Sequence, residues 1–144
     1  MRHGQASYSV SPDRERPLSY EGRVQIVSVV QKILGEWPVS KVISSPYLRA
    51  WQTGSLVADV AGCEIESMDE LIPDGDPHAV VHNLPEHCGC VLLSSHMPMV
   101  SKLAGLLCEG SVDCGPPFSV GAAALLELDF VAVGMSRLVK MILP

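Results

Sequence analysis

The sequence predicts an α/β fold, a three-layer α/β/α sandwich with a mainly parallel central sheet. Short apolar segments alternate with amphipathic helical segments in three successive units, which is typical of parallel strands joined by helices. Hydrophobic residues make up 47% of the chain and charged residues 18%, so the composition supports a buried core and excludes a disordered chain. From the length of 144 residues we expect one domain over residues 1–144.

The first unit has a truncated strand. Met1–Gly4 is typical of the end of a strand, and a polar loop runs from there to Pro17. A helix is predicted over about 19–34, with Ser19 as its N-cap. We expect the natural chain to start upstream of Met1, with about four or five more strand residues. Without them, the two strands on either side lose a ladder partner.

The second unit begins with the short apolar segment Lys41–Ser45, which predicts a buried strand. Pro46 follows, and we predict a helix from there to about Ala61, since proline is tolerated where a helix starts. The apolar positions of this helix that we expect in the core are Leu48, Leu56 and Val60.

The third unit pairs a strand at Val91–Ser95 with a helix that follows His96-Met97-Pro98 and ends near Leu107. Less regular elements surround it. We expect a short strand near Ile65, a turn at Pro73–Gly75, a short helix over Pro77–Leu84, and two final strands at Ala122–Leu128 and Met135–Ile142, separated by a turn at Gly134.

Polar side chains follow each predicted parallel strand. Arg2 and His3 follow the first, Arg49 comes shortly after the second, and His96 follows the third. Ligands of such sheets bind at the carboxyl ends of the strands, so these side chains should converge on one site. Two arginines and two histidines together predict an anion site with a nucleophile or an acid–base group inside it.

The net charge of −6 excludes a general nucleic-acid-binding protein, which needs a basic surface, so the anion site must be local. No apolar run is long enough to span a membrane, and the first residues do not form a signal peptide. We therefore expect a cytoplasmic monomer with no membrane or nucleic-acid partner. The five cysteines are expected to be reduced, because their number is odd and their spacing irregular.

The segments that carry these side chains resemble the histidine phosphatase superfamily, which is phosphoglycerate mutase-like. The resemblance rests on Arg2-His3-Gly4, a later arginine after a strand, and a second histidine after another strand. Longer stretches resemble one branch, the bacterial phosphohistidine phosphatases of the SixA type. These stretches are Arg2–Ala6, Arg16–Ser19, Ser45–Thr53 and Ser95–Val100.

The resemblance implies a role for each matched residue. His3 matches the histidine that becomes phosphorylated, Arg2 and Arg49 match the phosphate clamp, His96 matches the second histidine of the pocket, and Arg16 matches a further arginine of this branch. It implies a metal-independent phosphatase without a cofactor. It also implies a histidine-phosphorylated protein, such as a phosphotransfer domain, as substrate and partner, and the absence of a long insertion that could cover a small metabolite favours the same substrate.

The chemistry explains these residue types. A neutral imidazole is a competent nucleophile toward phosphorus, and arginine forks bind the equatorial oxygens of the transferred group in pairs. An oxygen leaving group also needs an acid, for which Glu70 in Asp69–Gly75 is the candidate. A phosphohistidine substrate needs the acid less, because imidazole leaves more easily than an alkoxide.

Other interpretations remain open. The chain could hydrolyse a small phosphorylated metabolite, or be a non-catalytic phosphoryl-binding module that is inactive because its first strand is absent. Taken singly, His3 could be a surface histidine at a frayed end, Arg49 could pair with a carboxylate, and Arg16 could be solvated. A second group has zinc-ligand residue types but no standard zinc spacing, so we predict no metal site there: His78, His82, His87, Cys88 and Cys90. We expect the helix with His78 and His82 to be a solvent-facing cover.

Overall fold

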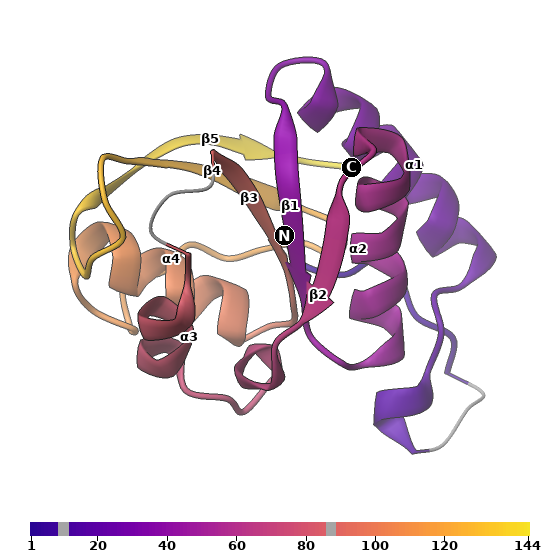
Figure 1. The fold of residues 1–144 in the computed structure, drawn as a ribbon. Helices are drawn as coiled ribbons and strands as arrows, with labels where there is room; N and C mark the ends of the chain where they lie inside the picture. The colour runs from indigo at the N-terminus through magenta and orange to yellow at the C-terminus, as the bar shows by residue number, and fades with distance from the viewer. Residues whose placement is uncertain (9–11, 86–88) are drawn as a thin grey trace.

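The computed structural model describes residues 1–8, 12–85 and 89–144, which form a helix-flanked parallel sheet and a separate strand pair (Figure 1). In the sheet, β1 (Val39–Ser44) lies between β2 (Glu64–Ser67) and β3 (Cys90–Ser94), and both neighbours run parallel to it. The other pair, β4 (Ala123–Leu128) and β5 (Ser136–Ile142), is antiparallel. The predicted mainly parallel α/β architecture is confirmed.

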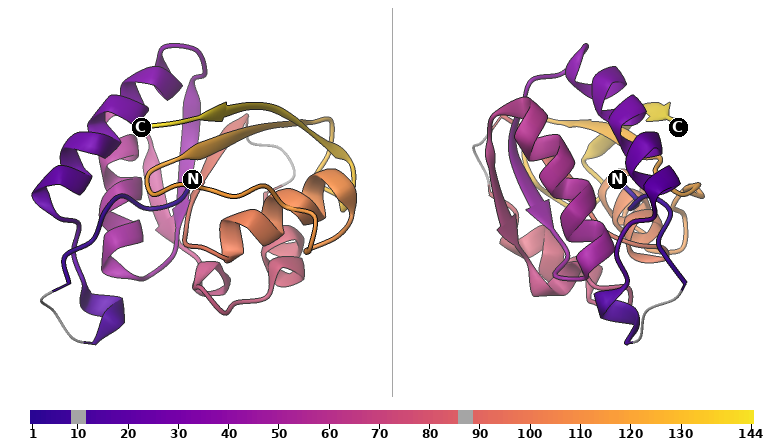
Figure 2. Two further views of the ribbon diagram at one scale, coloured as in Figure 1. Left: turned by 180° about the vertical axis from the view of Figure 1, so that it is seen from behind. Right: turned by 90° about the vertical axis from the view of Figure 1, so that its right-hand side faces the viewer.

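Helices cover both faces of the sheet (Figures 1 and 2). The helices α1 (Tyr20–Leu34) and α2 (Leu48–Ala61) lie on one face, and α3 (Pro77–Asn83) and α4 (Met99–Glu109) on the other. The strand β1 shows why two cores form. Val42 packs with α1 and α2, whereas the next residue, Ile43, packs with α3 and α4, because successive side chains of a strand point to opposite faces.

Most predicted elements lie within two residues of their observed bounds. The Ser19 side chain accepts a hydrogen bond from the Gly22 N–H and caps α1 as predicted. Gly134 adopts the positive φ of 71° that suits its turn. The prediction of Val60 as a core residue is wrong, because its side chain is 62% exposed. It lies on the flank of the buried stripe of α2, in which Val57 is fully buried.

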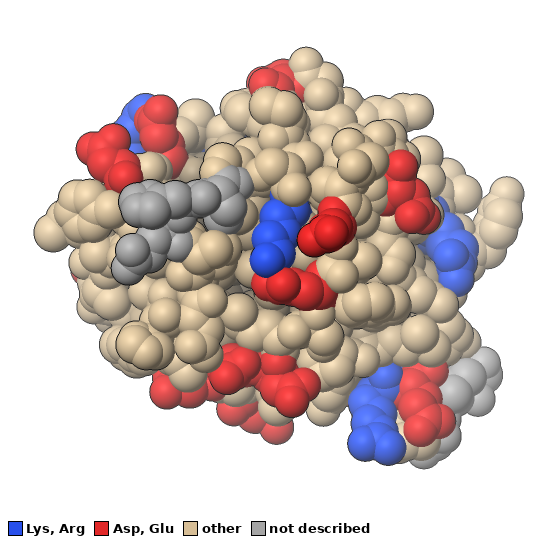
Figure 3. All heavy atoms as spheres, in the orientation of Figure 1, with Lys and Arg blue, Asp and Glu red and all other residues tan. Residues whose placement is uncertain are grey.

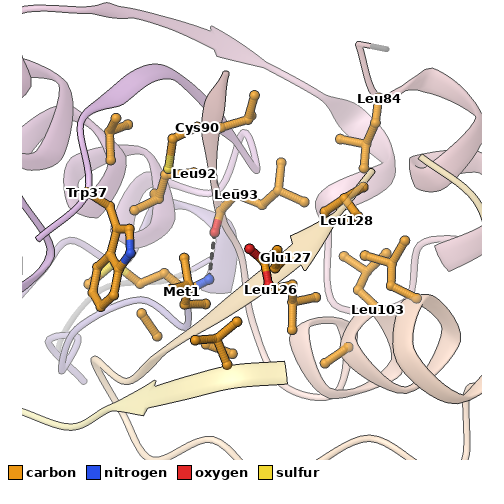
Figure 4. A pocket seen from close by; sticks show the side chains of 18 of the residues that line it. Met1, Trp37, Leu84, Cys90, Leu92, Leu93, Leu103, Leu126, Glu127 and Leu128 are labelled. Carbon is orange, nitrogen blue, oxygen red and sulfur yellow. Dashed lines mark hydrogen bonds between the residues drawn. The ribbon is translucent and has the colours of Figure 1, made fainter. Parts of the chain in front are cut away.

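A gap separates the two sheets. In the described part of the chain, no ladder joins β3 to β4, and only residues 1–3 bridge them at one end. Arg2 forms an isolated parallel bridge with Ser95, and its N–H donates to the Ala122 carbonyl at 2.8 Å. Beyond Met1 the gap is an apolar slot of about 820 Å³ between the facing edges of β3 and β4 (Figure 4).

The amino group of Met1 ends in this slot. It donates to the Leu93 carbonyl at 2.7 Å, and the Met1 side chain packs into the core that α1 and α2 share with β1 (Figure 4). Burial lowers the pKa of this amino group to about 5, because the charged form is cut off from water. Separately, none of the described helices is long and apolar enough to cross a membrane.

Candidate active site

Three of the predicted site residues meet at the carboxyl end of the parallel sheet. His3 follows the short strand-like bridge at Arg2, Arg49 lies in the first turn of α2, and His96 comes two residues after β3. The Nε of Arg49 is 3.1 Å from Nε2 of His3, and the rings of His3 and His96 are 5.0 Å apart between centroids, edge to face. The sheet therefore brings together side chains 46 and 93 residues apart in sequence.

Two glycines let the chain around His3 approach α1 closely. A Cβ at Gly4 would lie 2.8 Å from the Ile26 side chain, and one at Gly22 would overlap the carbonyl oxygen of Gln5. The same segment is tied to α2 by Thr53, whose hydroxyl accepts from the Gly4 N–H at 3.2 Å and donates to the Arg49 carbonyl at 2.8 Å. The loop with the histidine and the helix with the arginine are thus held to each other.

The hydrogen bonds of His3 define which of its nitrogens can react. Nδ1 is 2.7 Å from the Gly4 carbonyl oxygen, which accepts only, so the proton of the neutral ring lies on Nδ1. Nε2 then carries the lone pair, and it accepts from Arg49. Burial, followed by the charges of Arg49, Arg2 and Arg16, lowers the pKa of His3 to about 4, although the hydrogen bond to Gly4 acts in the opposite direction. The ring is therefore neutral at pH 7.

His96 is almost fully enclosed. Its Nε2 lies 2.9 Å from the Ser45 hydroxyl, the Tyr47 ring packs against it edge to face at 5.1 Å, and the side chain is 2% exposed. Its Nδ1 is buried and has no hydrogen-bond partner among the described residues. Burial, with the nearby His3 and Arg49, lowers the pKa of His96 to about 3, so this ring is also neutral at pH 7.

Asp13 is a site residue that the sequence did not reveal. Its carboxylate lies 2.9 Å from Nη2 of Arg49 and 2.8 Å from Nη1 of Arg16, and its backbone carbonyl accepts from Nη1 of Arg49 at 2.7 Å. It belongs to a short 3₁₀ turn, η1 (Asp13–Glu15), within the segment predicted as a polar loop. These contacts hold the pKa of Asp13 below its ordinary value. The i,i+3 spacing of Asp13 and Arg16 was the one available signal.

The remaining predicted residues lie at different distances from this centre. Arg2 donates through Nη1 to the Phe118 carbonyl at 2.7 Å, and its Nε is buried and has no partner among the described residues. Arg16 is held by Asp13, by the Ser7 carbonyl at 2.7 Å, and by the face of the Tyr8 ring. Glu70 lies in a second 3₁₀ turn, η2 (Asp69–Leu71), where it accepts from Asn83 of α3 at 3.2 Å.

The site is locally positive on an acidic protein. Three guanidinium groups and one carboxylate give a net charge of +2 while both histidines are neutral, and these are the groups that act on the pKa values of His3 and His96. On the face shown in Figure 3, basic side chains occur singly beside acidic ones, without a continuous basic surface. Such a site can bind one phosphoryl group and place it next to an unprotonated imidazole nitrogen.

The second group of candidate ligands does not converge in the described residues. His78 and His82 are exposed on α3, which therefore forms a solvent-facing cover as expected. His87 and Cys88 lie outside the described residues. Among the residues that the structure does describe, no three metal-ligating side chains come close enough to hold an ion.

Comparisons of the sequence and of the fold with known proteins point to the same family. Residues 1–72 match the family model of the histidine phosphatase superfamily (branch 1). The chain is 34% identical to phosphohistidine phosphatase SixA of Escherichia coli over 136 residues, 90% of this chain and 83% of that protein. It is 28% identical to a SixA homologue of Haemophilus influenzae over 126 residues, 74% of each chain. The solved structure of the protein histidine phosphatase SixA complexed with tungstate superposes with a TM-score of 0.87, at 30% identity over 100% of this chain and 94% of that one.

Proposed function

Because the chain belongs to the histidine phosphatase superfamily, we propose that it is a phosphatase that removes the phosphoryl group from a histidine-phosphorylated protein. The reaction passes through a covalent intermediate on His3 and needs no metal or cofactor. One observation carries the proposal: a half-buried, neutral His3 directs its unprotonated Nε2 at the guanidinium of Arg49, beside the ring of His96. A nucleophile and an anion clamp thus share one site.

The first step transfers the phosphoryl group to the protein. Nε2 of His3 attacks phosphorus while the bond from phosphorus to the substrate nitrogen breaks, and the substrate imidazole leaves in its neutral form because its other nitrogen has taken up a proton from solvent, which the attacking water of the second step returns. The hydrogen bond from Nδ1 to the Gly4 carbonyl favours this step, because it stabilises the positive charge that develops on the ring. In the second step, water attacks phosphorus and the bond to Nε2 breaks, which releases inorganic phosphate and restores neutral His3.

The arginines supply the charge that this transfer requires. Arg49, Arg2 and Arg16 stabilise the equatorial oxygens of the phosphoryl group, and the buried position of Arg49 strengthens its hydrogen bonds there. Asp13 and His3 accept from three of the five N–H groups of the Arg49 guanidinium, one on each nitrogen. A phosphoryl group that binds Nη1 and Nη2 therefore competes with Asp13, and an anion with two or more charges competes for that position better than a carboxylate.

The test is release of inorganic phosphate from a histidine-phosphorylated phosphotransfer domain in the presence of EDTA. We expect turnover that tungstate or vanadate inhibits competitively and that Arg49→Ala lowers at least 100-fold, on the order of the loss reported for removing one transition-state donor. Lys102→Ala, which removes a charge from α4 instead, is the control and should keep its activity. Absence of turnover in the wild-type chain would contradict the proposal. Activity that is lost in EDTA and restored by zinc would contradict its metal independence.

A further inference from the structure

Ser45 lies next to His96 at the end of β1. Its side chain is fully buried, and its hydroxyl oxygen is 2.9 Å from Nε2 of His96. The other ring nitrogen, Nδ1, is buried and has no partner among the described residues. The two nitrogens of this ring therefore differ in their surroundings, since a hydroxyl group contacts one and no described group forms a hydrogen bond with the other.

The hydrogen bonds of the Ser45 hydroxyl determine where the proton of His96 lies. The backbone N–H of Tyr47 donates to this oxygen at 3.4 Å, so the hydroxyl acts as the acceptor in that contact. Among the described residues, its own proton has one acceptor within hydrogen-bond distance, Nε2 of His96. A neutral imidazole carries one proton, and a nitrogen that accepts from a hydroxyl is the unprotonated one. The hydrogen-bond network thus assigns the His96 proton to Nδ1.

We propose that Ser45 is a positioning residue that holds His96 in the Nδ1–H tautomer, so that a neutral histidine presents a hydrogen-bond donor to the phosphoryl oxygens. The opposite tautomer would present a lone pair at Nδ1, which repels the oxygens of phosphate. A charged histidine would also donate, but burial keeps His96 neutral at pH 7. A serine that donates to Nε2 therefore allows an uncharged ring to act as a donor. This inference deepens the proposed function and rests on it.

The direct test is the tautomer of His96 in the ligand-free protein. In protein with ¹⁵N-labelled histidine rings, two-bond ¹H–¹⁵N spectra distinguish a protonated from an unprotonated ring nitrogen, and the His3→Ala variant separates the His96 signals from those of His3. We expect a protonated Nδ1 and an unprotonated Nε2 in the wild-type chain. A proton on Nε2 would overturn the inference whatever the activity.

Three variants extend the test. Ser45→Ala should shift His96 toward the Nε2–H tautomer and weaken tungstate binding about tenfold, the effect of losing one hydrogen bond to a charged group. Ser45→Thr keeps the hydroxyl and should retain the wild-type tautomer. Ser44→Ala is the matched control: Ser44 is equally buried, but its hydroxyl donates to the Ser45 carbonyl and does not contact His96, so tautomer and affinity should not change.

The outcomes separate this inference from the proposed function. An unchanged His96 tautomer in Ser45→Ala, or an equal change in Ser44→Ala, would overturn the role of Ser45. A wild-type chain with the Nδ1–H tautomer that binds tungstate but hydrolyses no phosphohistidine would overturn the proposed function and leave the role of Ser45 in anion binding supported.

Discussion

Asp13 holds two arginines of the candidate site in place. Its carboxylate and its backbone carbonyl both contact Arg49, and the same carboxylate pairs with Arg16. The carboxylate side chain is 57% exposed, so water partly screens these ion pairs and a phosphate dianion can replace them. The residue both orients Arg49 before binding and competes with the ligand for it.

The first prediction concerns this competition. Asp13→Asn keeps the size of the side chain and the backbone contact but removes the negative charge, so tungstate or phosphate should bind severalfold more tightly, because no carboxylate has to be displaced. Isothermal titration calorimetry measures the change. Asp59→Asn removes the same charge from an exposed position near the carboxyl end of α2 and should leave the affinity unchanged. Weaker binding in Asp13→Asn would contradict this competition and show that the negative charge of Asp13 helps the arginines to bind the anion.

A second prediction at this scale concerns the leaving group. Glu70 is bound to Asn83 and contacts neither histidine in the described residues, although Ser95, next to His96, donates to the carbonyl of its neighbour Leu71. We expect phosphohistidine to be hydrolysed at least 100-fold faster than phosphoserine, because the alkoxide needs an acid and the imidazole does not. Glu70→Gln should leave phosphohistidine turnover unchanged. Equal rates on the two substrates, both lowered by Glu70→Gln, would identify Glu70 as a working acid.

Residues of the site were predictable from the sequence to different degrees. His3, Arg49 and His96 were found because each follows a parallel strand, and the topology alone brings such positions together. Asp13 was missed because its contact with Arg49 joins a loop to a helix 36 residues away, and no periodicity records where such a loop returns. The alternative interpretation of Arg49, an ion pair with a carboxylate, is also observed. Its partner is Asp13, which lies in the candidate site itself.

Among the secondary-structure elements, the slot between β3 and β4 is the main departure from a regular sheet. The facing edges of these strands run beside an apolar cavity, and Met1 lies at one end of it (Figure 4). The helices and paired strands were predictable because their apolar periodicity is local. The slot could not be predicted, because it depends on how the edges of two strands that are far apart in sequence face each other.

The third prediction concerns an added segment that would occupy this slot. An apolar segment such as Met-Lys-Leu-Tyr-Leu, linked ahead of Met1, should pair with both edges, bury apolar surface and raise the melting temperature by about 5 °C or more. Turnover should rise as well, because His3 would follow a complete strand. A Ser-Gly-Ser-Gly-Ser extension of the same length is the control and should change neither value. An apolar extension without effect would show that the sheet needs no strand there.

For the molecule as a whole, three groups that are buried or half-buried resist protonation. The Met1 amino group has a pKa of about 5, His3 of about 4 and His96 of about 3, all lowered mainly by burial. In the unfolded chain these groups bind protons at their ordinary, higher pKa values. Unfolding therefore takes up protons over this range, and the free energy of unfolding rises with pH. At pH 6.5, the ordinary histidine value, histidines of the unfolded chain are still half protonated, so their contributions are complete only about one pH unit higher, whereas that of the amino group continues past its ordinary value of 8.0.

The fourth prediction concerns the pH range above the ordinary histidine pKa, in which the amino group titrates. Between pH 6.5 and 8, the free energy of unfolding should rise by about 2.5 kcal/mol, of which the amino group supplies about 1.5 kcal/mol and the two histidines the rest. Urea denaturation at several pH values measures this slope. Acetylating Met1 removes the amino group from the titration, so the rise in this window should fall to about 1 kcal/mol, the part that the two histidines supply. The thiols of Cys63, Cys90 and Cys108, whose pKa is raised by burial, act in the opposite direction at higher pH. A flat profile in the unmodified chain would contradict a buried Met1 amino group.

His3 should carry the phosphoryl group during turnover, and a rapid-quench experiment can trap this intermediate. The protein is mixed with a phosphotransfer domain that carries a radiolabelled phosphohistidine, quenched within milliseconds to seconds, and digested for peptide mapping. We expect label on the peptide that contains His3, stable in base and labile in acid. His3→Ala should carry no label and turn over on the order of 10³-fold more slowly, whereas His78→Ala on α3 should behave as wild type. Phosphate release by His3→Ala near the wild-type rate, without a labelled intermediate in either chain, would contradict the account.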